Sequence, residues 1–218
     1  MSSLSSAEWD RRYGGSELLW TATPNRFLVA EAGDLAPGRA LDLATGEGRN
    51  AAWLAEQGWQ VVGVDFSETG LAKARRLAAA RGVEAEWVSA DLRTYRPEPR
   101  AFDLVLVFYL QLPESERRST LRAAAEAVAA GGTLLVVAHD SSNLEHGHGG
   151  PQSPDVLYTP DDVVADLDGS GLETERALVV ERPVETPDGE RVALDALVRA
   201  RRAGSPNTSQ RQGEPERE

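Results

Sequence analysis

The chain contains no cysteine, and this absence removes several kinds of chemistry at once. Disulfide bonds, zinc sites built from thiolates and cysteine nucleophiles are all excluded. Long apolar runs are missing too, because no uncharged stretch approaches the roughly 18–20 residues that cross a membrane as a helix. The opening segment, MSSLSSAEWDRR, lacks the apolar core of a signal peptide. We therefore expect no membrane association, and a cytoplasmic location is the default expectation.

The chain has fewer basic than acidic residues: 23 Lys and Arg against 35 Asp and Glu, which gives a formal net charge of −12. Such an overall field repels a nucleic-acid backbone, so we expect no nucleic-acid partner, although a local basic groove is compatible with this net charge. The 218 residues suit one domain, and 41% apolar with 27% charged side chains is typical of a globular chain. A repeat of roughly 20–50 residues is not found, which argues against a solenoid.

From residue 39 onward, short apolar runs alternate with helical patterns. Strands are expected at 40–44, 61–65, 84–90, 102–110 and 133–139, with helices at about 50–57, 67–81 and 113–130 between them. Two later β-rich runs, 172–182 and 191–201, are joined by the turn sequence Thr186-Pro187-Asp188-Gly189 and should form an antiparallel hairpin. The pattern predicts an α/β fold with a doubly wound, mostly parallel seven-stranded sheet that ends in this hairpin.

The two ends of the chain differ from this alternating region. Residues 1–38 should form a helical cap, with one helix capped by Ser6 and running to about Tyr13, and another from Pro24-Asn25 to Pro37-Gly38. The segment 140–158 has no periodicity and is expected to be a long loop, a length that is often functional. Its glycines permit movement, and Leu144, Val156, Leu157 and Tyr158 are expected to provide the apolar surface of a lid. Residues 203–218 are almost free of apolar side chains and should be a disordered tail. We therefore expect a single domain over 1–202.

The first predicted strand runs directly into the glycine-rich turn Asp42-Leu43-Ala44-Thr45-Gly46-Glu47-Gly48. Ligands of doubly wound sheets bind at the carboxyl ends of the strands, and the glycines permit a tight turn with close ligand approach. Asp42, Asp65 and Asp91 stand at the ends of three consecutive strands. A single aspartate at a strand end can equally well cap a helix or lie in a solvent-exposed turn. Three of them at consecutive strand ends favour a binding site for a ligand that carries a ribose.

Two common nucleotide motifs are absent from this region. Ala51 breaks the dinucleotide fingerprint G-x-G-x-x-G, and the phosphate loop G-x-x-x-x-G-K-[ST] does not occur. Acids around the turn suit a ligand with an ammonium group and a ribose rather than a pyrophosphate.

At these residues the chain resembles the class I S-adenosylmethionine-dependent methyltransferases, in particular the tellurite-resistance and thiopurine methyltransferase-like group. The resemblance rests on ALDLATGEGRNAAWLAEQGWQVVGVDFS (40–67), Trp9 to Tyr13, Pro24 to Leu28, Ala90 to Leu92, and FDLVLVFYLQLP (102–113). It implies S-adenosylmethionine as the cofactor, with its methionine end on the turn 42–48. The resemblance also places the ribose on Asp65 and the adenine beside Phe66 and Asp91. Ala44 departs from the many members that have a glycine there.

The residues that this resemblance and the surrounding pattern assign to cofactor binding are Tyr13, Trp20, Arg26, Asp42, Ala44, Thr45, Gly46, Gly48, Asp65, Phe66, Ala90, Asp91, Leu92 and Phe108. The implied reaction is methyl transfer to a small-molecule acceptor by in-line displacement, which requires alignment and exclusion of water. A motif of the N/D-P-P-Y/F type, which would indicate a nucleic-acid acceptor, does not follow the fourth strand. A nicotinamide-dependent oxidoreductase and a non-catalytic S-adenosylmethionine sensor remain as alternatives.

A general base is needed only if the acceptor must lose a proton. His139, at the end of the fifth strand, is the candidate base, with a structural role as the alternative. His146 and His148 stand in a glycine-rich loop, where solvent exposure is more common than chelation, so we expect no bound metal. Arg26 and Arg49 either pair with the cofactor carboxylate or an anionic substrate, or cap surface acids.

Four aromatic residues, Trp9, Tyr13, Trp20 and Phe27, lie in the N-terminal region. They either roof the cofactor, where their rings would contact the sulfonium by cation–π interaction, or simply pack the cap on the sheet. Neither the acceptor nor the oligomeric state follows from the sequence.

Overall fold

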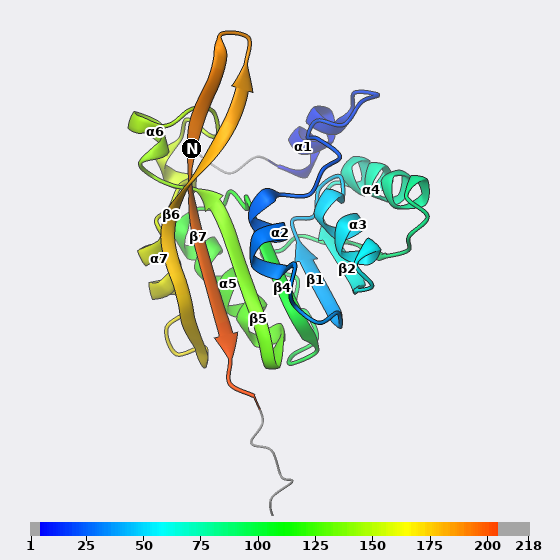
Figure 1. The fold of residues 1–218 in the computed structure, drawn as a ribbon, viewed down its shortest axis with the longest axis vertical. Coiled ribbons are helices and arrows are strands. Elements are labelled where there is room, and N and C mark those ends of the chain that lie inside the picture. The colour runs from blue at the N-terminus through cyan, green and yellow to red at the C-terminus, as the bar shows by residue number, and fades with distance from the viewer. Residues whose placement is uncertain (1–4, 205–218) are drawn as a thin grey trace, which may run out of the picture.

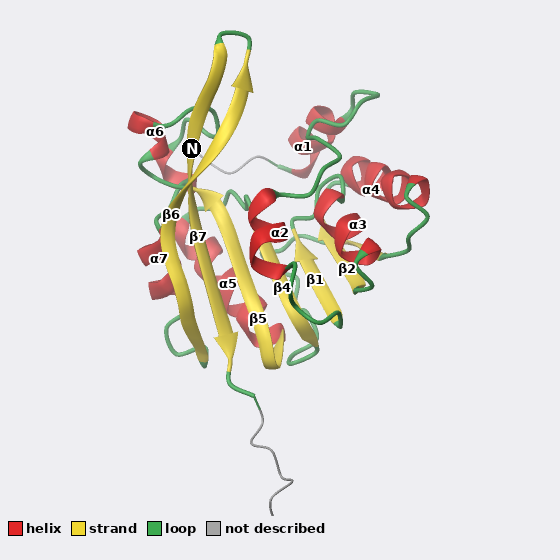
Figure 2. Cartoon of the chain, in the orientation of Figure 1, coloured by secondary structure: helices red, strands yellow, loops and turns green. Residues whose placement is uncertain are grey.

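The computed structural model describes residues 5–204, whose strands form one sheet between two helical layers (Figures 1 and 2). The seven strands are ordered β3-β2-β1-β4-β5-β7-β6. They are β1 (Arg39–Leu43), β2 (Gln60–Asp65), β3 (Glu86–Ser89), β4 (Phe102–Phe108), β5 (Val128–His139), β6 (Leu172–Thr186) and β7 (Gly189–Arg202). Strands β1 to β5 pair in parallel, whereas β7 runs antiparallel to both β5 and β6. The predicted doubly wound, mostly parallel sheet with its C-terminal hairpin is confirmed.

Helices cover both faces of this sheet, and the apolar strands are explained by that double coverage. In Figure 1, α2 (Arg26–Ala32) and α3 (Arg49–Glu56) lie in front, and α5 (Glu114–Ala127) and α7 (Pro160–Asp166) lie behind. Along β4 the even-numbered Leu104 and Leu106 pack with the front layer, and the odd-numbered Val105 and Val107 with the rear layer. α1 (Ser6–Tyr13) packs on α4 (Glu68–Ala80) beside the sheet.

Side-chain caps fix where the helices begin, with one shift from the prediction. Asn25 accepts from the Phe27 N–H and caps α2, and Ser67 accepts from the Gly70 N–H at 3.1 Å and caps α4. The cap of α1 is Ser5 rather than Ser6, because Ser5 closes a capping box with Glu8.

Two predicted helix ends are wrong. α2 already stops at Ala32, where the Gly33 N–H bonds back to the Val29 carbonyl. α5 stops at Ala127, and β5 begins at once with Val128 opposite Phe102. Gly131 and Gly132 therefore lie inside a strand, at a register shift between β4 and β5, where glycine is common.

The segment 140–158 is docked on the protein rather than being a bare loop. It contains α6 (Asn143–His146) and the 3₁₀ helix η1 (Pro154–Val156). Asn143 accepts from the Leu194 N–H at 2.7 Å, and Tyr158 donates to the Leu110 carbonyl at 3.1 Å. Val156, Leu157 and Tyr158 are buried, so the expectation that they form apolar lid surface is wrong.

The hairpin is longer than predicted and projects beyond the sheet. Its strands are joined by Pro187-Asp188 alone, and β5 pairs only with residues 195–201 of β7. The outer part of the hairpin therefore extends past the carboxyl edge of the parallel strands, at the top of Figure 1.

The sharing of one sheet by all described strands supports our proposal of a single domain over 1–202. Of the predicted tail 203–218, residues 205–218 lie outside the described residues. No helix within residues 5–204 is both long and apolar enough to cross a membrane.

Candidate active site

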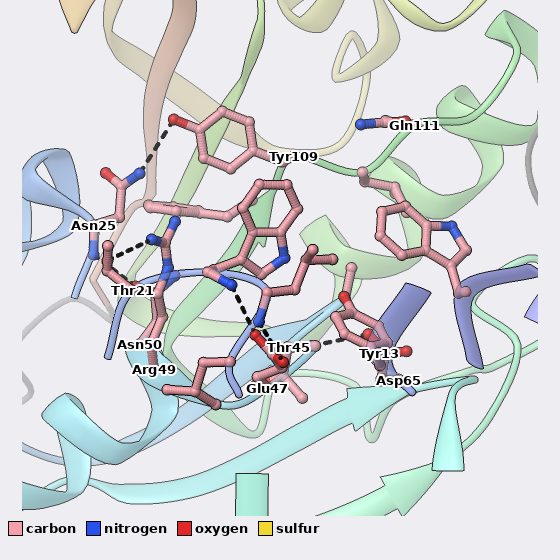
Figure 3. A pocket seen from close by; sticks show the side chains of 18 of the residues that line it. Tyr13, Thr21, Asn25, Thr45, Glu47, Arg49, Asn50, Asp65, Tyr109 and Gln111 are labelled. Atoms are coloured by element: carbon pink, nitrogen blue, oxygen red, sulfur yellow. Dashed lines mark hydrogen bonds between the residues drawn. The ribbon is translucent and has the colours of Figure 1, made fainter. Parts of the chain in front are cut away.

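A cavity of about 560 Å³ opens at the carboxyl ends of the parallel strands (Figure 3). The chain order reverses between β1 and β4, which is the usual ligand position in a doubly wound sheet. Residues 14–24, called the strap here, link α1 to α2 and contribute to the wall opposite the strand ends. Of the predicted site residues, those lining the cavity are Tyr13, Trp20, Arg26, Ala44, Thr45, Gly46, Asp65, Phe66, Asp91, Leu92, Phe108 and His139.

Three predicted cofactor residues stand behind this lining. Asp42 is buried beneath the turn, where its Oδ2 accepts from Thr45 Oγ1 at 2.7 Å. Gly48 is the N-cap of α3, and Ala90 donates its N–H to the Asp65 carbonyl at 3.0 Å. Their geometry supports the turn and the neighbouring strand, and a direct contact with a ligand remains a prediction for each of them.

The glycine turn contains three left-handed residues within five positions, Ala44 (φ +62°), Gly46 (φ +56°) and Gly48 (φ +78°). Alanine is uncommon in this region of backbone space, so the turn holds Ala44 at an energetic cost. A Cβ on Gly46 would lie 2.8 Å from the Tyr13 hydroxyl oxygen. The missing side chain at Gly46 therefore allows the tyrosine of α1 to close over the turn.

The Asp65 carboxylate stabilises the turn and keeps acceptor capacity for a bound ligand. Its Oδ2 accepts from the Gly46 N–H and its Oδ1 from the Ser67 N–H, each at 2.9 Å. Burial raises the pKa of Asp65 despite these two hydrogen bonds. A carboxylate offers about four lone-pair positions, so both oxygens keep capacity for the hydroxyls of a ligand.

Asp91 is already engaged by a neighbour that the sequence reasoning missed. Arg93 Nε lies 2.9 Å from both carboxylate oxygens of Asp91, and Arg93 Nη2 lies 2.5 Å from Oδ2. These bonds lower the pKa of Asp91. A ligand amine that reached Asp91 would share the carboxylate with Arg93.

A second missed group lies where the hairpin meets the cavity, which we call the hairpin end. Asp195, fully buried on β7, accepts from Tyr109 Oη at 2.8 Å and from Arg182 Nε at 2.7 Å. His139 Nδ1 lies 3.4 Å from Asp195 Oδ1, an ion-pair distance without hydrogen-bond alignment. Burial opposes ionisation of Asp195, but these three neighbours outweigh it and lower its pKa.

Two unusual backbone conformations hold the aromatic pair at this end. Tyr109, directly after β4, has φ +54°, a strained value for a bulky residue. Its ring centroid lies 4.8 Å from that of His139, and its hydroxyl accepts from Asn25 Nδ2 at 3.2 Å (Figure 3). Left-handed Gly150 covers the imidazole so closely that a Cβ would lie 3.0 Å from His139 Nδ1. The strained backbone of Tyr109 beside His139 marks this end as a candidate reaction site.

The arginines that the sequence left open occupy different positions. Arg26 is exposed at the mouth of the cavity. Arg49 is partly buried, and burial lowers the pKa of its guanidinium. Arg49 lines the cavity, and its hydrogen bond to Thr21 Oγ1 is long, at 3.4 Å, so its guanidinium keeps donor capacity for an anionic group.

The remaining candidates are placed by burial. Trp9 lines the cavity with Tyr13 and Trp20, as a roof requires, whereas Phe27 packs in the core between α2 and the sheet. His146 and His148 are exposed. Within residues 5–204 no group of three or more metal-binding side chains is arranged to hold an ion.

The sheet order, the glycine turn and the acid at the end of β2 are those of the class I S-adenosylmethionine-dependent methyltransferases. Residues 40–132 match the family model of the methyltransferase domain. The predictions of the class, the fold and S-adenosylmethionine as its cofactor are confirmed.

Several curated relatives share part of the chain. Demethylmenaquinone methyltransferase of Thermus thermophilus is 38% identical over 125 residues, which are 56% of this chain and 55% of the relative. The ubiquinone/menaquinone biosynthesis C-methyltransferase of Desulfotalea psychrophila is 39% identical over 88 residues, or 39% and 35% of the two chains. Ribosomal RNA small subunit methyltransferase C of Alcanivorax borkumensis is 32% identical over 111 residues, or 47% and 33%. The chain thus spans about half or less of these relatives, and the expected lack of a nucleic-acid partner stays a prediction.

Solved structures share the fold over nearly the whole chain. One, from work on the conversion of a disulfide bond into a thioacetal group during echinomycin biosynthesis, has a TM-score of 0.72 at 24% identity and 94% coverage of both chains. TehB from Haemophilus influenzae has a TM-score of 0.69 at 17% identity, covering 90% of this chain and 66% of its own. The predicted likeness to the tellurite-resistance group thus extends to the fold.

Proposed function

We propose that this protein transfers a methyl group from S-adenosylmethionine to a small-molecule acceptor bound at the hairpin end of the cavity. The proposal rests on one observation: a single cavity has two ends that are lined by chemically different groups. The glycine turn and Asp65 form one end, and the Asp195 network with His139 forms the other. When bound, the cofactor supplies a methyl group activated by its positively charged sulfur.

The residues of the turn fit such a cofactor. Asp65 keeps lone pairs for ribose hydroxyls, and Phe66 and Leu92 provide an apolar surface beside it for a flat base. Arg49 offers donors to a carboxylate, and Trp20 offers an aromatic face to a sulfonium. The volume of about 560 Å³ lies within the range of small-molecule sites.

The hairpin end fits an acceptor that loses a proton. His139 lines the cavity, and its Nδ1 edge faces buried Asp195, which would stabilise the imidazolium after proton uptake. Leu110, Pro183 and Val184 add apolar wall that excludes water from the displacement. Two relatives named for methylation of quinones support a flat, oxygen-bearing ring as the acceptor.

Calorimetric titration with S-adenosylmethionine and with a nicotinamide dinucleotide tests the cofactor. We expect binding of the first alone, and binding of the second alone would overturn the proposal. Turnover is then measured as S-adenosylhomocysteine formed with hydroquinones, phenols, thiols, amines and chalcogen oxyanions. If S-adenosylmethionine binds but no acceptor class yields S-adenosylhomocysteine, the non-catalytic sensor is favoured instead.

A further inference from the structure

The single lysine of the chain is buried in an ion pair with a residue of the glycine turn. Lys73 Nζ on α4 lies 3.0 Å from Glu47 Oε1, and their side chains are only 4% and 3% exposed. Burying two charges costs more than their attraction returns unless further hydrogen bonds satisfy both groups. The partners of this pair therefore indicate its role.

Those further partners all belong to the strap. Glu47 Oε1 accepts from the Leu19 N–H at 2.9 Å, and Oε2 accepts from the Trp20 N–H at 3.0 Å (Figure 3). Lys73 Nζ donates to the Glu17 carbonyl at 2.5 Å. The buried pair is thus satisfied only while the strap lies over the turn.

The strap depends on these bonds more than on packing. Among the described residues it contains neither helix nor strand, and Trp20 is 46% exposed although it lines the cavity. A half-exposed tryptophan contributes only part of its possible burial energy. Farther along, Arg81 Nη2 donates to the Ala22 carbonyl at 2.5 Å. Polar contacts to the strap backbone, with the Glu47–Lys73 pair at the centre, set its position.

We propose that Glu47 and Lys73 are positioning residues that latch the strap over the cofactor. The proposal rests on the proposed function, because the strap supplies Leu18, Leu19 and Trp20 to the wall of the cofactor cavity. Release of the cofactor then requires the latch to break. Both charges are hydrated when the strap opens and are paired again when it closes.

The unique lysine provides a direct test on the intact wild-type chain. Modification of Lys73 by acetic acid N-hydroxysuccinimide ester, followed by mass spectrometry, reports how often the strap opens. We expect slow modification that S-adenosylmethionine slows further, and faster modification in Glu47→Gln. A Lys73 that reacts as fast as a free amine, or at the same rate in wild type and Glu47→Gln, would overturn the latch.

Dissociation of S-adenosylhomocysteine, followed by stopped-flow tryptophan fluorescence, tests the effect on the ligand. Glu47→Gln and Lys73→Met should each speed dissociation by about tenfold or more, with little change in association. Arg75→Met, which removes an exposed ion pair with Glu68 on the same helix, is the matched control and should leave both rates unchanged. Unchanged dissociation in both latch variants contradicts the proposal.

The two proposals fail in different ways. If the wild type binds neither S-adenosylmethionine nor S-adenosylhomocysteine, the proposed function is wrong. The modification rates of wild type and Glu47→Gln without ligand still decide whether the latch exists.

Discussion

The carboxylate of Asp42 is buried with too few hydrogen-bond and charge partners to offset its lost hydration, so replacing it by a neutral group should stabilise the protein. The side chain is 1% exposed, and its Oδ1 has no partner of hydrogen-bonding geometry among residues 5–204. Burial, with Asp65 close by, raises its pKa from 3.8 to about 7. Asn at this position keeps the shape and can still accept the hydrogen bond from Thr45.

The size and sign of the effect follow from this pKa. Between about pH 4 and pH 7 the folded protein holds a proton that the unfolded chain has released, so wild-type stability falls as the pH rises through that window. A difference of about three pKa units corresponds to about 4 kcal/mol. We expect Asp42→Asn to equal the wild type near pH 4 and to exceed its free energy of unfolding by about 2–4 kcal/mol at pH 8.

The same charge should matter for the cationic cofactor. S-adenosylmethionine attracts ionised Asp42 and lowers its pKa on binding, so wild-type affinity should rise about tenfold from pH 6 to pH 8. In Asp42→Asn this rise should disappear. The variant would then be more stable and bind more weakly, the trade-off expected of a functional charge.

Urea denaturation followed by tryptophan fluorescence from pH 4 to pH 8 measures the stability, and calorimetry measures the affinity. Asp166→Asn is the matched control, because this fully buried carboxylate is bonded to Arg117 Nε at 2.7 Å and Arg118 Nε at 2.9 Å. Its neutralisation should destabilise the protein at pH 8. If Asp42→Asn were no more stable than wild type at pH 8 while the control lost stability, the reasoning would be refuted.

Three further variants test the turn and the proposed chemistry. Gly48→Ala should destabilise the fold by about 2–4 kcal/mol in denaturation, because its Cβ would lie 2.6 Å from Ala74 Cβ at a φ of +78°. Asp65→Ala should weaken cofactor binding roughly 30–150-fold in calorimetry, and a change below threefold with the fold intact would remove it from the site. His139→Asn should lower turnover about 10²–10⁴-fold with cofactor affinity little changed. Near-normal turnover at every pH would show that alignment and desolvation suffice without this histidine.

The parts of the fold that could be predicted are those with a local signal. The apolar strands and the hairpin turn are each readable from a few neighbouring residues. The end of α5 was missed because Gly131 and Gly132 were interpreted as a helix stop, whereas the sheet accommodates them at a register shift. The sequence favours a lid role for Leu157 and Tyr158, because only tertiary packing shows that both are buried.

In the candidate site, too, the residues with a local sequence signal could be predicted and those that meet only through tertiary contacts could not. The turn and Asp65 are recognisable because motif and spacing are contiguous in sequence. Arg182 and Asp195 meet only through the register of the hairpin, and Tyr109 joins them from another strand. Lys73 and Glu47 likewise come together through the packing of α4 on the turn. A contact between segments that are distant in sequence leaves no pattern in either of them.

Most of the residues proposed to hold the acceptor come from a different part of the chain than the residues proposed to hold the cofactor. His139, Arg182 and Asp195 all follow residue 132, where the match to the methyltransferase domain family ends, whereas Asp65 and the turn precede it. The boundary between the two parts contains the pairing of β4 with β5, the buried Arg117–Asp166 ion pair and the Tyr109–Asp195 hydrogen bond. A chimaera that receives residues 133–202 from a protein of the same fold, with these two side-chain contacts kept, is expected to retain its methyl donor and to take on the acceptor preference of the protein that supplied the segment.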